Sequence, residues 1–231
     1  MSEPSDWIDD DDPSGDGPDA AFGSGYDSGS GYDSEEACDG DDLADGRHAE
    51  SLRGRFLIAG PQLRDRNFFK TVVLVLEHTP VGAMGLVVNR PSSLTLCNAL
   101  AGQIELADGE ENVFIGGPVE PSHLFLMHAD QGWSEASIEI VPGLMVTTDP
   151  EAFEAIVTSE PPPPRRVVSG YAGWSADQLD GERRSGDWLE IEADMPTVLA
   201  GDPYTMWDEL IARLGAAHPI VRDPAPHPEW N

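Results

Sequence analysis

The sequence predicts an α+β fold: a single mixed domain with a β-sheet core and several short helices, preceded by a disordered acidic tail. Three observations favour this class. The first 50 residues have almost no aliphatic side chains. The chain then contains several aliphatic, β-branched runs that are typical of strands. Segments with helical spacing follow Asp-Pro pairs, which can begin a helix. We therefore expect a folded domain over residues 51–218 and a proline-rich C-terminal end over residues 219–231.

The acidic tail covers residues 1–50. It contains 17 Asp or Glu residues and one basic residue, Arg47, so it carries −16 of the chain's net charge of −30. Its only Leu, Ile or Val residues are Ile8 and Leu43, too few to bury the apolar surface that would offset the loss of chain entropy. The sequence Gly-Ser-Gly-Tyr-Asp-Ser occurs twice, at 23–28 and 29–34. It is either a pair of tyrosine-based contact or phosphorylation sites or the result of replication slippage, and the second interpretation is preferred.

Strands are expected in the first half of the domain at 56–59, 71–78 and 84–89. The second of these is a continuous β-branched run, which is typical of a strand covered on both faces. Pro91 is expected to end the third strand, because proline cannot donate to a sheet ladder. Ser92 or Ser93 is then expected to cap a short helix.

The second half of the domain continues the mixed pattern, with strands expected at 113–115, 124–128, 166–173 and 188–192. Asp149 and Asp202 each precede a proline and predict the starts of two helices, and Gly215 is expected to end the second one. Ser175 and Gln178 have the spacing of a capping box and predict another helix start. Four prolines at 161–164 are expected to form a stiff connector.

Composition argues against several classes of protein. The chain has 13 Lys or Arg against 43 Asp or Glu, so direct nucleic-acid binding is disfavoured because it needs clustered cations at the phosphates. No apolar run approaches the ~18 residues of a membrane span. Cys38 and Cys97 make neither a disulfide framework nor a zinc set. No nucleotide-binding or hydrolase motif is present. We expect a reduced, cytoplasmic protein with no cofactor, no metal and no membrane association.

One group of polar residues is a candidate binding site. Glu77 and His78 end one expected strand, and Asn89 and Arg90 end the strand expected to pair with it. If these ends meet at one sheet edge, the four side chains form a polar pocket able to hold an anion or to perform acid–base chemistry. In the structural alternative, which is preferred, Asn89 makes a turn, Arg90 pairs with Glu77 and His78 merely ends a strand.

Two further candidate binding sites are weaker. One interpretation of Gly116 and Gly117 is that their backbone amides form an anion-binding nest before Pro118, but a tight turn is the preferred interpretation. Tyr171 and Trp174 precede an expected helix and suggest an aromatic-walled pocket, although a place at the edge of the core is preferred. Catalytic residues stay unknown.

Several motifs occur in a specific order, namely 54–59 with Pro61, 69–72, 77–78, 82–91, 116–119, 170–174, 178–179, Trp188 and 207–215. Through these motifs nearly all of residues 52–215 resembles the YqgE/AlgH family of bacterial proteins. The resemblance implies a cytosolic α+β domain with no settled biochemical activity and no assigned catalytic residues. One member's label suggests transcriptional regulation. The acidic tail departs from the family pattern.

Two functional hypotheses follow. The first is a non-enzymatic binding or indirect regulatory protein, whose partner is another protein or a small ligand. The second is an enzyme of unknown reaction that uses Glu77, His78, Asn89 and Arg90. The two are distinguished by whether these four side chains converge on a cleft.

Overall fold

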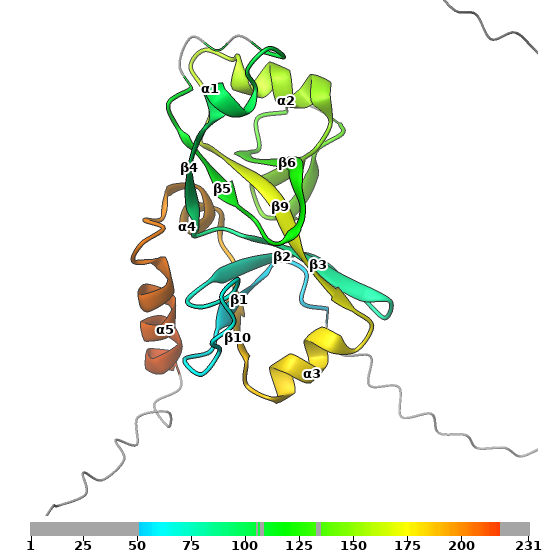
Figure 1. Ribbon diagram of the computed structural model, residues 1–231, viewed down its shortest axis with the longest axis vertical. Helices are drawn as coiled ribbons and strands as arrows, with labels where there is room; N and C mark the ends of the chain where they lie inside the picture. The colour runs from blue at the N-terminus through cyan, green and yellow to red at the C-terminus, as the bar shows by residue number, and fades with distance from the viewer. Residues whose placement is uncertain (1–50, 105, 107–108, 133–134, 218–231) are drawn as a thin grey trace, which may run out of the picture. The chain divides into compact units, whose positions relative to one another are not determined.

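The computed structural model of the chain describes residues 51–104, 106, 109–132 and 135–217 (Figure 1). The predicted tail over residues 1–50 and the predicted proline-rich end over residues 219–231 lie outside the described residues. None of the described helices is long and apolar enough to cross a membrane.

Four strands form one half of the sheet, in the order β10–β1–β2–β3. They are β1 (Arg55–Ala59), β2 (Val72–Thr79), β3 (Gly82–Val87) and β10 (Trp188–Glu192). All neighbouring pairs are antiparallel, with Phe56 opposite Leu74 on β2 and opposite Ile191 on β10. The first five residues of β2 are all buried, which confirms that its β-branched run is covered on both faces.

The long strand β9 (Arg165–Ser175) links the two halves of the sheet. Its C-terminal part pairs with β3, with Trp174 opposite Ala83. Its N-terminal part pairs with β6 on one side and with β5 on the other. Figure 1 shows β9 running from the upper group of strands to the lower one. Gly170 lies where β9 passes between the two halves, because Ser169 pairs with β6 and Ala172 pairs with β3.

The second half of the sheet continues from β9 through β6, β8 and β7. These strands are β6 (Val119–Ala129), β7 (Ile138–Val141) and β8 (Leu144–Thr147), and all their pairings are antiparallel. On the other side of β9 lie β5 (Asn112–Ile115), which is parallel to β9, and β4 (Pro91–Thr95), which pairs with β5.

The sheet curls around a shared hydrophobic core. Phe56 and Leu74 from the first half pack in the same buried cluster as Phe125 and Val146 from the second half. A second cluster lies on the other face of the first half of the sheet. It contains Trp174 together with side chains from β1 and β2. A third cluster lies near the start of β9, beneath the helices at 96–99 and 150–157. The expected α+β domain with a β-sheet core is therefore confirmed.

Within the described residues, five short helices cover this sheet (Figure 1): α1 (Leu96–Ala99), α2 (Pro150–Val157), α3 (Gln178–Arg184), α4 (Met195–Ala200) and α5 (Met206–Ala217). Helices α1 and α2 bury Leu96, Phe153 and Ile156 in the third cluster. Helix α3 places Leu179 in the second cluster. As predicted, Asp149 caps α2, and its carboxylate accepts a hydrogen bond from the amide of Ala152 at 2.9 Å.

The expected strands are confirmed within β1, β2, β3, β5, β6, β9 and β10. The expected cap of the first helix is wrong. Ser92 lies in β4 and donates to the carbonyl of Val113 at 2.7 Å, so the chain stays extended until Thr95 caps α1. The expected helix end at Gly215 is also wrong, because α5 continues to Ala217. Gln178 accepts from the amide of Ser175 at 3.0 Å, as in a capping box, but α3 begins only at Gln178.

Candidate functional site

The polar residues expected at one sheet edge lie at opposite ends of the β2–β3 hairpin. His78 pairs with Ala83 beside the turn, whereas Asn89 follows β3 and accepts from the amide of Val72 at the start of β2. Six residues at ~3.3 Å each separate these points by roughly 20 Å. Glu77, His78, Asn89 and Arg90 therefore do not converge, because antiparallel pairing places the end of one strand beside the start of the other.

Asn89 and Arg90 instead hold the segment between β1 and β2. Asn89 is buried; its amide oxygen accepts from Val72 N at 2.8 Å, and its amide nitrogen donates to the carbonyl of Lys70 at 3.0 Å. The guanidinium of Arg90 donates to the carbonyls of Asn67 at 2.6 Å, Phe69 at 3.1 Å and Arg66 at 3.2 Å. Partial burial lowers the pKa of Arg90, and the nearby carboxylate of Asp65 opposes this shift. The expected pairing of Arg90 with Glu77 is not formed.

His78 and Glu77 do not contact each other's functional partners: His78 faces the chain before β1 and α3, and Glu77 faces solvent. The Nδ1 atom of His78 accepts from the amide of Leu52 at 3.2 Å, and its Nε2 atom lies 3.9 Å from a carboxylate oxygen of Asp180. Asp180 also binds Arg183 at 3.0 Å. Glu77 is exposed on the rim of a small groove of about 220 Å³ that also contains Met84 and Ile138. His78 thus joins the chain before β1 to α3, which is a structural role.

Gly116 and Gly117 mark a close backbone crossing. A Cβ atom on Gly116 would lie 2.2 Å from the carbonyl oxygen of Gly170, and one on Gly117 would lie 2.1 Å from the carbonyl carbon of Tyr171. The amide of Gly116 donates to the carbonyl of Ser169 at 2.8 Å, so it is not available to an anion. These contacts favour a structural role for the glycines over the anion-binding nest.

Tyr171 and Trp174 lie on opposite faces of β9, because they are three positions apart along the strand. The ring of Tyr171 packs against Phe125, with centroids 6.2 Å apart. Trp174 packs in the second cluster against Trp188, with centroids 5.9 Å apart. Both indole N–H groups donate to the same carboxylate oxygen of Glu182, at 2.9 and 2.8 Å. The two aromatic residues therefore do not wall a common pocket.

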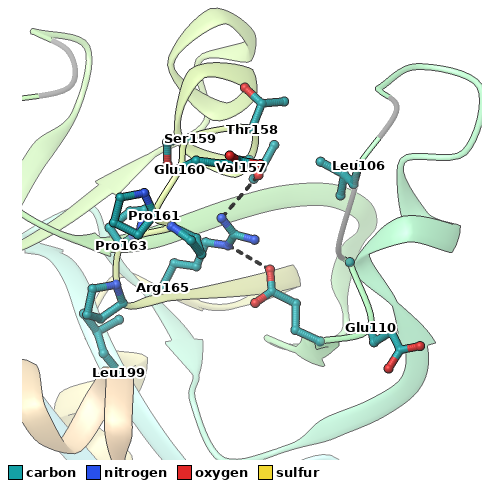
Figure 2. Close-up of a pocket in the computed structure, with 14 residues that line it drawn as sticks. Leu106, Glu110, Val157, Thr158, Ser159, Glu160, Pro161, Pro163, Arg165 and Leu199 are labelled. Carbon is teal, nitrogen blue, oxygen red and sulfur yellow. Dashed lines mark hydrogen bonds and ion pairs between the residues drawn. The ribbon is translucent and has the colours of Figure 1, made fainter.

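The candidate site that the structure favours is a cleft of about 1030 Å³ between the end of α2 and the start of β9, here called the α2–β9 cleft (Figure 2). One wall is the segment 157–164, which includes the four consecutive prolines. Leu106, Glu110 and Glu111 precede β5 on the opposite side, and Leu199 of α4 completes the lining. The proline run predicted a stiff connector, but nothing in the sequence indicated that this connector faces a cleft.

Arg165 fixes the walls of the α2–β9 cleft. Its side chain is only 6% exposed, and its Nε atom donates to the carboxylate of Glu111 at 2.8 Å. Its Nη1 atom donates to the carbonyls of Ile156 at 3.2 Å and Val157 at 3.3 Å, at the C-terminal end of α2. Figure 2 shows the guanidinium pointing toward Val157. Cations are favoured at this end of a helix, so one side chain joins the end of α2 to the segment before β5.

The lining of the cleft combines apolar walls with negative charge. Glu110 and Glu160 are exposed and make no ion pair within the described residues, whereas the charge of Glu111 is matched by Arg165. The two hydroxyl groups of the lining are already occupied: Thr158 donates to the carbonyl of Glu154, and Ser159 donates to that of Ile156. The cleft therefore presents carboxylates and apolar surface, with no hydroxyl free of an internal hydrogen bond.

Comparison with known proteins agrees with this architecture. A family model described as AlgH-like (DUF179) matches residues 56–219. A UPF0301 protein of Myxococcus xanthus is 40% identical over 169 residues, which is 72% of this chain and 92% of the relative. A UPF0301 protein of Thioalkalivibrio sulfidiphilus is 36% identical over 182 residues, which is 78% of this chain and 98% of the relative.

Solved structures show the same fold. The solution structure of the AlgH protein from Pseudomonas aeruginosa matches with a TM-score of 0.64 and 32% identity, over 78% of this chain and 97% of that chain. A crystal structure of a protein from Corynebacterium diphtheriae matches with a TM-score of 0.57 and 23% identity, over 69% of this chain and 85% of that chain. Sequence motifs, family model and fold agree, and the chain belongs to the AlgH-like (DUF179, UPF0301) family of bacterial proteins.

Proposed function

We propose that this chain is a non-enzymatic binding protein whose α2–β9 cleft receives an extended, positively charged segment of a partner protein. The observation that carries the proposal is the cleft itself, whose walls are fixed by Arg165 and which offers unpaired carboxylates beside proline and leucine side chains. A preformed cleft lowers the entropic cost of binding, because its walls do not need to be ordered by the ligand.

The chemistry of the cleft suits this class of ligand. Glu110 and Glu160 attract Lys or Arg side chains, and the prolines and Leu199 supply apolar surface for the rest of an extended peptide. The overall net charge of −30 favours encounter with a basic partner. A small-molecule ligand is less favoured, because the cleft of about 1030 Å³ lies at the upper end of the range that small ligands occupy.

The enzymatic alternative depended on four polar side chains meeting at one sheet edge, and they do not meet there. It required Glu77 and His78 to meet Asn89 and Arg90, and these pairs lie at opposite ends of a hairpin. Binding is therefore preferred as the function, and we place it in the cytoplasm because the cysteine content suits a reducing compartment. Any regulatory effect would then be indirect, through the partner, since the acidic chain disfavours contact with DNA phosphates.

The proposal is tested by titrating the full chain with an array of proline- and leucine-containing peptides that carry different numbers of Lys residues. We expect affinity to rise with peptide charge, and the double variant Glu110→Lys/Glu160→Lys to weaken binding about tenfold or more. The matched control is Glu154→Lys, an exposed charge reversal on α2 outside the lining of the cleft. Equal loss of affinity in the control, or no dependence on peptide charge, would contradict the proposal.

A further inference from the structure

In the described part of this acidic chain, the unpaired cations are concentrated at one place. Among the described residues, Arg64 and Arg66 are exposed and their guanidinium groups make no hydrogen bond or ion pair. Every other described Lys or Arg side chain has such a partner, namely Arg53, Arg55, Lys70, Arg90, Arg165, Arg166, Arg183, Arg184 and Arg213. Free positive charge in the described part of the chain is thus confined to residues 64–66.

These cations belong to the segment 64–70, here called the 64–70 loop, which is firmly attached to the domain. Arg90 donates to three of its carbonyls, and Asn89 donates to a fourth. Phe68 packs against both indoles of the second cluster, with its ring centroid 5.4 Å from that of Trp188 and 6.3 Å from that of Trp174. The loop is thus held both through its backbone carbonyls and through the packed ring of Phe68. Such a loop is preorganised for binding, because little conformational freedom remains to be lost.

The same loop exposes an aromatic side chain. Phe69 is 53% exposed, although its backbone carbonyl is held by Arg90. Lys70 follows it, stacked over the ring of Trp207 at 4.6 Å from the centroid and paired with Asp208 at 3.4 Å. Arginine and aromatic residues are the types that dominate binding energy at protein interfaces. Two free arginines beside an exposed phenylalanine therefore mark an interaction surface.

We propose that the 64–70 loop docks an acidic segment of a partner protein that also presents an apolar side chain. The planar guanidinium groups of Arg64 and Arg66 can each bind a carboxylate through two parallel hydrogen bonds. Phe69 would cover the apolar side chain beside them. This surface has the opposite charge to the α2–β9 cleft, so the proposal does not depend on the function proposed for that cleft.

A short acidic segment fits this surface better than a nucleic acid does. A nucleic acid presents phosphates over a long stretch and needs many cations, whereas the described loop offers two free ones. Asp65 lies between the two arginines in sequence and opposes any anion there, and Lys70 is already paired with Asp208, so a polyphosphate that extended beyond Arg64 and Arg66 would meet no further free cation in the described loop. A peptide can place its carboxylates at Arg64 and Arg66 alone.

The test uses the full chain and a fluorescent peptide in which Asp and Glu alternate with Leu and Phe, with an Asn/Gln counterpart as the neutral probe. We expect saturable binding of the acidic peptide that weakens with added salt, and at least about tenfold weaker binding of the neutral one. The variant Arg64→Ala/Arg66→Ala should weaken binding of the acidic peptide about tenfold, and Phe69→Ala should weaken it severalfold.

The matched control is Arg213→Ala, which removes an exposed arginine from α5 and should leave the affinity unchanged. The proposal is overturned if the acidic peptide does not bind, if the double variant or the neutral peptide binds equally well, or if a single-stranded oligonucleotide binds more tightly than the peptide. Binding of cationic peptides to the α2–β9 cleft should survive the Arg64→Ala/Arg66→Ala changes, so the failure of one proposal is distinguishable from the failure of the other.

Discussion

At the scale of single residues, several polar side chains hold other parts of the fold in place. Asn89 and Arg90 bind the carbonyls of the segment before β2, and Glu182 accepts hydrogen bonds from Trp174 and Trp188. Buried hydrogen-bonding groups are costly to leave unpaired. Each of these side chains supplies a hydrogen-bond partner that its neighbours would otherwise lack. This structural role accounts for the side chain without any catalytic role.

The variant Arg90→Ala should lower the free energy of unfolding by about 1–3 kcal/mol, because three carbonyls lose a charged donor. Arg90→Lys should recover only part of this loss, since one ammonium group cannot span all three acceptors. Chemical denaturation measures the effect, and Arg66→Ala is the control because its side chain is exposed and unpaired. A change of less than about 0.5 kcal/mol, typical of an ordinary surface substitution, would contradict this account.

At the scale of elements, local sequence patterns predicted most strands but failed where tertiary pairing decides the outcome. The β-branched run of β2 and the Asp149 cap of α2 were predictable because each depends on adjacent residues. The hairpin of β7 and β8 was missed, although Pro142 and Gly143 between two aliphatic segments are a turn signal.

The candidate site was less predictable than the fold, because it depends on contacts between distant segments. Arg165 meets Glu111 across 54 positions of sequence, and Arg90 meets the 64–70 loop across more than 20. The pocket suggested at Glu77 and His78 is absent for a different reason. The two strands do pair, but they are antiparallel, so the end of β2 lies beside the start of β3 and not beside its end.

The crossing of β9 with the segment after β5 gives an element-scale prediction. Gly170 has a φ of +71°, and a Cβ atom there would lie 2.8 Å from the carbonyl oxygen of Gly117 and 2.9 Å from that of Val119. Gly170→Ala should therefore destabilise the domain by about 3 kcal/mol, since backbone strain adds to a steric clash. Gly181→Ala in α3 is the control: open space surrounds it, and it should stabilise by about 0.5–1 kcal/mol. Thermal melts that showed similar effects for both variants would refute the crossing.

At the scale of the whole molecule, charge is distributed unequally. The net charge is −30, and most cations of the described residues are already paired with groups of the same domain. Arg166 is the extreme case: it is buried over the ring of Phe114 at 4.2 Å, and desolvation lowers its pKa to about 10. Arg165 and Arg166, which are adjacent in sequence, thus do not make a basic surface. The number of Lys and Arg residues in the sequence therefore exceeds the number of cations that a polyanion would contact.

This distribution predicts that the full chain binds duplex DNA more weakly than about 10⁻⁴ M at physiological salt, the weak end of ordinary non-specific binding. Even if Arg64 and Arg66 both reached phosphates, two contacts would give a salt slope of only about −1.8, whereas proteins that bind DNA by charge make several times as many contacts. Fluorescence anisotropy with a random duplex at several salt concentrations measures both quantities. The variant Arg64→Ala/Arg66→Ala should remove whatever weak binding appears at low salt. Tight binding with a steep salt slope would instead require a basic face that the described residues do not present, and it would restore direct DNA binding as the basis of regulation.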